Sequence, residues 1–272
     1  MDRTSLATRR DELPESAVHT VAVDLVEQTS AFAKRHPWEV ARAEFFLRLL
    51  RQRGLLETGH DWLDVGAGDA WFARQLRRLL SPTASLTCWD INYSAADLAT
   101  KEEHDGISLV ADRPSRRFDR VLMLDVIEHV EDDGKFISMI ADDLLAEDAV
   151  VLVSVPAYQG LFSSHDRSLH HYRRYSPGEC RRLLEGSGLV VLAEGGLFHS
   201  LLPVRLGQAL MERVRPVKSL SRGIGNWQAG TAATKAVTRA LITDAKLSLL
   251  LSARGLSLPG LSYWALCSAK SA

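Results

Sequence analysis

The fold is decided by residues 62–70, which read WLDVGAGDA. A short apolar run ends in Asp64, Val65 and two glycines, and a stretch with helical spacing follows. Glycines at such a turn let the backbone approach a ligand closely, because they adopt positive φ without a steric penalty. The amino end of the next helix offers free N–H groups. This segment therefore predicts a ligand site where a strand passes into a helix.

Outward from this turn, short apolar runs alternate with helical stretches. Strands are predicted at 62–65, 85–90, 107–110, 118–125, 149–155, 189–193 and 261–268, and helices at 69–80, 94–101, 131–145, 177–186 and within 200–254. Nearly continuous apolar strands are typical of parallel sheets that helices cover on both faces. Alternation of strands and helices at this spacing indicates βαβ units and an open α/β sheet.

Two helices are expected ahead of the sheet. Apolar residues recur at helical spacing from about residue 15 to residue 53, with a break at His36-Pro37. Because proline favours the first turn of a helix, the second helix is predicted to begin at Pro37. Residues 1–15 resemble a loose tail.

The composition is that of an ordinary globular protein. The 272 residues include 33 basic and 34 acidic side chains, for a net charge of −1, and 46% are hydrophobic. Balanced charge argues against a nucleic-acid partner. The three cysteines form no C-x-x-C pair, which argues against a zinc cluster or a redox dithiol. No segment has the roughly 18 consecutive apolar residues of a membrane-spanning helix, and residues 1–16 lack a secretory signal, so a cytoplasmic location is expected.

Two ligand classes compete for the glycine turn. A dinucleotide fingerprint requires G-x-G-x-x-G, but Trp71 occupies the third position, where an indole obstructs close packing of the helix on the strand. S-adenosylmethionine carries a sulfonium and an ammonium group, so the carboxylate of Asp64 suits it. Asp90 lies where an open α/β sheet places a ribose-binding acid, and Asp112 follows the next strand. Each acid alone is equally consistent with a turn former, but three at successive strand ends favour S-adenosylmethionine.

With these residues the chain resembles the class I S-adenosylmethionine-dependent methyltransferases. The run FDRVLMLDVIEHV at residues 118–130 is similar to the motif after strand four in small-molecule methyltransferases, including ubiquinone-biosynthesis O-methyltransferases. The resemblance implies an α/β fold with a Rossmann-like, seven-stranded, mostly parallel sheet, an antiparallel last strand, N-terminal helices and a helical insertion. The expected organisation is a tail and helical lid at 1–58, a cofactor-binding core at 59–199, the insertion at 200–255 and the final strand at 256–272.

A narrower similarity points to a bacterial methyltransferase subgroup associated with glycan or lipid-linked pathways. It rests on VPAY at 155–158, SHD at 164–166, HYRRY at 171–175, HPW at 36–38 with Arg42, and LPGLS at 258–262. The chain departs from this pattern at His170, where a glycine is usual.

The resemblance also implies the residues that contact S-adenosylmethionine. These are Asp64, Gly66, Gly68, Asp90, Ile91, Asp112, Asp125 and Val126. The two glycines line the methionine part of the cofactor, Asp90 binds the ribose hydroxyls and Asp112 binds the adenine amino group. Asp125 and Val126, at the end of strand four, form the floor under the sulfonium.

Methyl transfer is a direct displacement at carbon, so the enzyme must align the donor with the acceptor. A general base is needed when the acceptor is a hydroxyl or an ammonium group. His129 is the first candidate, because it follows strand four and histidine titrates near neutral pH. A histidine that packs locally is an equal alternative. Binding of Mg²⁺ by Glu128 and His129 is a weaker one, and no metal is expected.

Residues 165–175 hold the densest group of side chains capable of catalysis or binding. His165, Asp166 and His171 are expected to be catalytic, with Asp166 orienting His165 as a base. The residues expected to bind the acceptor are Trp38, Tyr172, Arg173, Arg174 and Tyr175. Adjacent arginines can grip a carboxylate or phosphate. A lid held together by internal salt bridges is an equal alternative for this segment, and a metal site is the least favoured one.

The stretch 200–255 carries leucines at helical spacing accompanied by arginines. Such a helix can lie on an anionic membrane surface, in this case the surface of the inner membrane. Packing on the domain or against a second subunit is the commoner arrangement. The expected function is S-adenosylmethionine-dependent methyl transfer to oxygen or nitrogen of a small-molecule, lipid-linked or glycan-linked acceptor. The alternatives are a non-catalytic cofactor-binding or scaffold protein of the same fold and a nicotinamide-dependent oxidoreductase.

Overall fold

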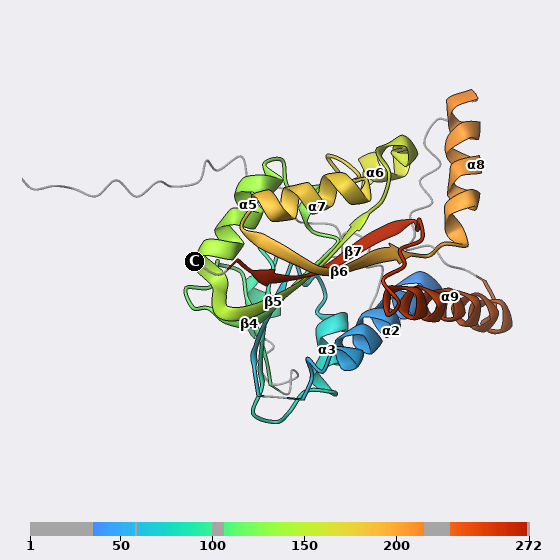
Figure 1. The fold of residues 1–272 in the computed structure, drawn as a ribbon. Helices are drawn as coiled ribbons and strands as arrows, with labels where there is room; N and C mark the ends of the chain where they lie inside the picture. The colour runs from blue at the N-terminus through green and yellow to red at the C-terminus, as the bar shows by residue number, and fades with distance from the viewer. Residues whose placement is uncertain (1–34, 58, 100–105, 215–228, 271–272) are drawn as a thin grey trace, which may run out of the picture.

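The computed structural model describes residues 35–57, 59–99, 106–214 and 229–270. They build one sheet in the order β3-β2-β1-β4-β5-β7-β6 (Figure 1). The strands are β1 (Asp61–Val65), β2 (Ser85–Trp89), β3 (Ile107–Val110), β4 (Phe118–Leu124), β5 (Leu145–Pro156), β6 (Leu189–Leu197) and β7 (Ser262–Ala269). Strands β1 to β5 pair in parallel, whereas β7 runs antiparallel to both β5 and β6. This confirms the predicted Rossmann-like fold.

Helices lie on both faces of the sheet (Figure 1). They are α2 (Pro37–Gln52), α3 (Trp71–Arg77), α4 (Ala95–Ala99), α5 (Asp133–Met139), α6 (Ser164–Ser168), α7 (Pro177–Gly186), α8 (Leu201–Val214) and α9 (Thr231–Ser252). Two short 3₁₀ turns, η2 (Ile127–His129) and η4 (Gln159–Leu161), follow β4 and β5. The helix predicted from about residue 15 lies mostly outside the described residues.

Helix α2 begins at Pro37, as predicted. The Nδ1 atom of His36 accepts a hydrogen bond from the backbone N–H of Trp38 at 3.1 Å, which caps the first turn. On its buried side, the ring of Phe45 packs edge-on against Trp264 of β7, with 5.6 Å between ring centroids. Leu241 and Leu249 of α9 belong to the same hydrophobic core. Helix α2 is therefore held by both the sheet and α9.

Two predicted helices are shorter than expected. The helix predicted at 69–80 begins only at Trp71, because Ala70 adopts a left-handed conformation with φ of 56°. The helix predicted at 131–145 is α-helical over Asp133–Met139 and continues as one π-helical turn, η3 (Ile140–Leu144). Strand β5 then starts at Leu145, four residues before its predicted start. At these places irregular backbone replaced the regular period on which the prediction rested.

Strands β6 and β7 are neighbours in the sheet, yet residues 198–261 separate them in sequence. Helices α8 and α9 lie in this stretch. Where the chain returns to β7, a Cβ atom at Gly260 would lie 2.4 Å from the backbone nitrogen of Leu197, so only glycine fits. Over the described segments, no helix is both long enough and apolar enough to cross a membrane.

Candidate active site

The glycine turn lies between the carboxyl ends of β1 and β2. Gly66 and Gly68 have φ of 63° and 52°, the left-handed region that favours glycine. The N–H of Gly66 donates to the carbonyl oxygen of Trp89 at 2.7 Å, and the N–H of Gly68 donates to Oδ2 of Asp90 at 2.9 Å. These bonds fix the turn against the end of β2.

Asp90 is buried and keeps part of its hydrogen-bonding capacity. Its Oδ1 accepts hydrogen bonds from the backbone and the side chain of Asn92, at 2.9 and 2.8 Å. A carboxylate offers about four lone-pair sites, so Asp90 has room for a ligand hydroxyl as well. Asp64 is also buried, Ile91 is half-buried, and Asp112 is exposed just beyond β3. Buried carboxylates beside glycines with positive φ fit a positively charged nucleoside better than a pyrophosphate.

Asp125 lies at the carboxyl end of β4 in a left-handed conformation, with φ of 59°. Its Oδ1 accepts a hydrogen bond from the hydroxyl of Ser154 at 2.6 Å, and its Oδ2 accepts one from the guanidinium of Arg42. The Arg42 guanidinium also lies 4.5 Å from the ring centroid of Trp38. Helix α2 therefore brings Trp38 and Arg42 to the strand end where the sulfonium is expected, and Val126 is buried beside it.

The segment 158–175 closes on the end of β5. The N–H of Tyr158 donates to the carbonyl oxygen of Tyr175 at 2.9 Å. The N–H of Tyr175 donates to the carbonyl oxygen of Pro156 at 3.1 Å. The N–H of Tyr172 donates to the carbonyl oxygen of Glu128 at 2.8 Å, which ties the segment to η2. The loop thus covers the turn that follows β4.

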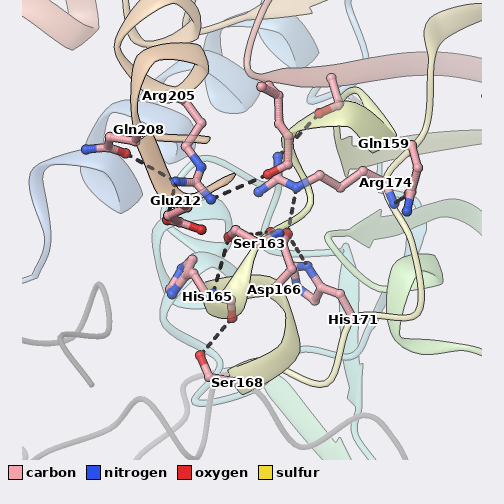
Figure 2. Close-up of polar contacts among 12 residues, drawn as sticks. Gln159, Ser163, His165, Asp166, Ser168, His171, Arg174, Arg205, Gln208 and Glu212 are labelled. Carbon is pink, nitrogen blue, oxygen red and sulfur yellow. Dashed lines mark hydrogen bonds and ion pairs between the residues drawn. The ribbon is translucent and has the colours of Figure 1, made fainter. Parts of the chain in front are cut away.

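Asp166 is the centre of the polar contacts in this segment (Figure 2). It has no exposed surface and accepts hydrogen bonds from the backbone and hydroxyl of Ser163, from His171 Nδ1 at 3.1 Å and from Arg174 Nε at 2.6 Å. Burial alone raises the pKa of the Asp166 carboxyl. The hydrogen bond from His171 and the Arg174 guanidinium outweigh that effect, so its pKa lies well below the usual range.

The prediction that Asp166 orients His165 is wrong, because Asp166 pairs with His171 instead. Residues adjacent in a helix do not face each other, and the Asp166 side chain points back to cap α6 at Ser163. In Figure 2 the His165 ring lies apart from Asp166. Its Nε2 is buried and makes no hydrogen bond within the described part of the chain, and burial lowers its pKa.

Glu128 and His129, which follow β4, form a polar cluster with His171 from the segment after β5. Glu128 is fully buried, and the rings of His129 and His171 lie edge to face with 4.5 Å between centroids. Burial, with the charge of Asp125, raises the pKa of Glu128 well above its usual range. Burial, with the proximity of His171, lowers the pKa of His129 to about 3. Sequence reasoning assigned Glu128 only a minor role, since nothing in the sequence predicted the loop that buries it.

The remaining side chains expected to bind the acceptor are held largely by internal contacts. Arg173 donates to Asp133 Oδ2 at 2.9 Å, and the hydroxyl of Tyr175 donates to the same oxygen at 2.7 Å. The ring of Tyr172 is exposed. A surface depression is lined by Gln159, Arg173, Arg174, Tyr175, Glu179 and Leu183. The structure thus places Arg173 in a salt bridge with Asp133, of the kind considered as the alternative for this segment, and Tyr175 in a hydrogen bond to the same carboxylate.

Comparisons with known proteins address the family. The sequence profile of a family described as a methyltransferase domain matches residues 38–194, more than half of the chain. A curated ubiquinone biosynthesis O-methyltransferase from Rhodopseudomonas palustris strain BisB5 is 26% identical over 166 residues, which are 54% of this chain and 65% of the relative. The protein from strain HaA2 is 25% identical over the same length. The chain thus spans just under two thirds of these relatives.

Two solved structures share the fold. A protein assigned as a sarcosine dimethylglycine methyltransferase from Galdieria sulphuraria is 18% identical, with a TM-score of 0.51 and coverage of 85% of this chain and 86% of that one. The [4+2]-cyclase SpnF is 14% identical, with a TM-score of 0.51 and coverage of 84% and 81%. At such identities the likeness concerns the fold alone.

Proposed function

The chain belongs to the methyltransferase domain family, and we propose that it transfers a methyl group to oxygen or nitrogen of a small-molecule, lipid-linked or glycan-linked acceptor. It is an S-adenosylmethionine-dependent methyltransferase. The observation that carries the proposal is the cluster of Glu128, His129 and His171, which follows β4 beside Asp125. We propose that the acceptor approaches the sulfonium beside these polar side chains.

For the cofactor, we propose that the carboxylate of Asp90 binds the ribose hydroxyls. The turn at Gly66 and Gly68 would admit the methionine part close to the backbone, and the carboxylate of Asp64 would attract its ammonium group. Asp112 is proposed to accept from the adenine amino group. The other proposed contacts are Ile91, Asp125 and Val126. The hydrogen bond from the N–H of Gly68 to Asp90 supports this arrangement, because it holds two of the contact groups together.

S-adenosylmethionine, when bound, supplies a methyl carbon on a sulfonium, to which the acceptor's lone pair bonds while the C–S bond breaks and its electrons stay on sulfur. The residues of the protein must orient the acceptor, exclude water and accept the proton that the acceptor loses. His129 stays neutral at physiological pH, because its pKa is about 3, so its ring can accept a hydrogen bond from an acceptor O–H. Asp166 fixes the ring orientation of His171. His165 is proposed to border the same space, through its buried Nε2.

The acceptor is proposed to contact Trp38, Tyr172, Arg173, Arg174 and Tyr175. Tyr172 is exposed, and Trp38 lies against Arg42 at the strand end. Arginine pairs well with carboxylate and phosphate groups, and a sugar phosphate or lipid phosphate carries such a group. The guanidinium groups are already engaged with Asp133 and Asp166, so an acidic acceptor would have to share those contacts.

We also propose that the surface of α8 and α9 meets an anionic membrane, which is where a lipid-linked acceptor resides. In α8, Leu206, Leu210 and Val214 are exposed, the last to 79%. In α9, the basic side chains are exposed and the acidic residue, Asp244, is buried. A surface that combines exposed apolar side chains with exposed cations favours an anionic lipid surface. Flotation with vesicles that contain phosphatidylglycerol tests this proposal. Binding that persists in the Leu210→Glu/Val214→Glu variant would contradict it.

The experiment for methyl transfer follows the formation of S-adenosylhomocysteine from S-adenosylmethionine. Candidate acceptors are a phenol, an amine and a polyprenyl-linked sugar, each with the wild type and with His129→Asn and His171→Asn. We expect product with one acceptor class and at least a tenfold loss in both variants. A scaffold protein of the same fold would bind S-adenosylhomocysteine but give no product with any acceptor. Such a result would favour that second function, and the cyclase SpnF shows that this fold is not confined to proteins named methyltransferases.

A further inference from the structure

The carboxylate of Glu128 is buried without a hydrogen-bond partner. Its side chain has no exposed surface, and within the described part of the chain neither Oε1 nor Oε2 makes a hydrogen bond. Buried polar groups are nearly always satisfied, because an unpaired one loses its hydration and gains nothing in return. The neighbouring guanidinium groups are already engaged, Arg42 with Asp125 and Arg174 with Asp166. Among the described residues, the Glu128 carboxylate therefore lacks a hydrogen-bond partner, and Arg42 and Arg174 act on it only through their charge.

Two imidazole nitrogens lie beside this carboxylate. The Nδ1 atom of His129 is buried and makes no hydrogen bond within the described residues, while the ring also hydrogen-bonds the backbone of Leu169. His171 bonds Asp166 through its Nδ1, which leaves Nε2 as its other nitrogen. One ligand atom from each of Glu128, His129 and His171 lies within 4.8 Å of the others.

We propose that Glu128, His129 and His171 bind a divalent transition-metal ion of the zinc class. Two imidazoles and one carboxylate suit Zn²⁺, Mn²⁺ or Co²⁺, whereas Mg²⁺ and Ca²⁺ prefer oxygen ligands. Three protein ligands leave a coordination position open, as in catalytic zinc sites. Ligand atoms that lie about 2.0–2.2 Å from an ion are roughly 3–4 Å apart, so a small rotation of the side chains completes the site.

The surrounding residues orient the two histidine ligands as metal sites require. A ligating histidine usually donates its other N–H to a carboxylate or a backbone carbonyl, which fixes its tautomer. Asp166 meets that requirement for His171, and the backbone of Leu169 does so for His129. The N–H of Tyr172 holds the carbonyl of Glu128 at 2.8 Å and so joins the two backbone segments that carry the ligands.

This inference rests on the proposed function in one respect, namely that the open position would take an oxygen or nitrogen of the methyl acceptor. With the metal bound, His129 would serve as its ligand and no longer as the hydrogen-bond acceptor for that group. The metal site itself can be tested without turnover. The chain is purified without a histidine tag, stripped with a chelator and titrated with Co²⁺, whose visible absorption reports nitrogen and oxygen ligands. Zn²⁺ content is measured in parallel by mass spectrometry. We expect one ion per chain.

The variants are Glu128→Gln, His129→Asn and His171→Asn, each of which keeps the approximate shape of the side chain. Each should weaken Co²⁺ binding at least 100-fold. The matched control is His170→Asn, because His170 is the exposed neighbour of His171 and its φ of 58° suits asparagine. This control should bind Co²⁺ as the wild type does.

Calorimetry with S-adenosylhomocysteine, carried out on every variant, separates loss of the metal site from loss of the fold. Loss of Co²⁺ binding with retained S-adenosylhomocysteine binding supports the metal site. A wild type that binds S-adenosylhomocysteine but no Co²⁺ or Zn²⁺ overturns it and leaves the proposed function intact. Equal loss of Co²⁺ binding in His170→Asn places the metal elsewhere and also overturns it. A wild type that binds metal but no S-adenosylhomocysteine contradicts the proposed function instead.

Discussion

The guanidinium of Arg42 donates a hydrogen bond to Asp125, a residue 83 positions away in sequence. Arg42 belongs to α2, which precedes the sheet in sequence. Asp125 directly follows β4, the central strand of the sheet. The same guanidinium lies over the ring of Trp38. Helix α2 therefore does more than pack against the sheet, because an ion pair joins it to the strand end where methyl transfer is proposed.

This pair predicts a difference between two arginines of the same helix. Arg42→Met leaves Asp125 with the Ser154 hydroxyl as its described partner and should lower the free energy of unfolding by about 1–2 kcal/mol. Arg48→Met removes an exposed pair with Glu44 and should cost less than about 0.5 kcal/mol. Urea denaturation of both variants measures the difference. Equal losses would show that this partly buried pair contributes no more than a surface one.

A second prediction concerns Asp90. Asp90→Ala removes the acceptor of the Gly68 N–H together with the carboxylate proposed for the ribose. Because a hydrogen bond to a charged group contributes about 1.5–3 kcal/mol, the affinity for S-adenosylhomocysteine should fall about 10- to 100-fold. Titration calorimetry measures the change. The control is Asp97→Ala, which removes a carboxylate that accepts hydrogen bonds from the N–H and the hydroxyl of Ser94 at the start of α4, and which should leave the affinity as it was.

Asp166 should be the most sensitive carboxylate for stability. Asp166→Asn keeps the shape of the side chain but leaves Arg174 and His171 facing an uncharged group in the interior. Breaking a buried pair from one side costs about 3–5 kcal/mol, which is a large part of a domain's total stability. Asp142→Asn, on an exposed side chain, should change the free energy of unfolding by less than about 0.5 kcal/mol. If Asp166→Asn lowers the free energy of unfolding no more than this control does, Asp166 is not an important carboxylate for stability.

The N-cap of α2 should respond to pH. Burial lowers the pKa of His36, so the folded state prefers the neutral ring, whose Nδ1 caps the helix. Above the unfolded pKa of about 6.5 the ring is neutral in both states and its contribution to stability is complete. As the pH falls below about 6.5 the unfolded chain takes up the proton first, and stability is lost until the lower folded pKa is reached.

Asparagine caps a helix without a charge change, so His36→Asn supplies the reference. Thermal unfolding of the wild type and this variant at pH 7.5 and 5.5 should show that the wild type loses more stability on acidification. An identical loss in both proteins would mean that His36 titrates alike in the folded and unfolded states.

Two glycines near β7 and in α8 should behave in opposite ways. Gly260→Ala places a Cβ 2.4 Å from the backbone of Leu197, where the close strand contact leaves no space, and should destabilise the fold by about 1–3 kcal/mol. Gly207→Ala, inside α8 with no atom within 4 Å of the added Cβ, should stabilise the protein by up to about 1 kcal/mol. Chemical denaturation reports both signs.

The sequence predicts the sheet better than it predicts the site. The apolar strands, the glycine turn and the start of α2 at Pro37 carry local signals, and the structure confirms them. The start of α3 was misplaced because a left-handed alanine, Ala70, carries no such signal. At His170 the departure from the expected glycine does mark a left-handed residue, because its φ of 58° is a conformation that glycine adopts without strain.

The contacts within the site depend on tertiary structure. The pairing of Asp166 with His171 rather than His165 follows from the direction of the helix cap, and the burial of Glu128 follows from the loop that Tyr172 anchors. Both arise from where the segment after β5 folds back. Periodicity gives no information on that path, and the only local signal in the sequence is the spacing of Ser163 and Asp166, which form the capping box of α6.

The position of β7 between β5 and β6 has a consequence for biosynthesis. A ribosome releases β5 and β6 early, but the strand that joins them emerges only after residues 198–261. Until then one edge of β5 has no partner, and exposed edges recruit other chains. Insertion of β7 therefore closes an edge of the sheet that, until then, could pair with another chain.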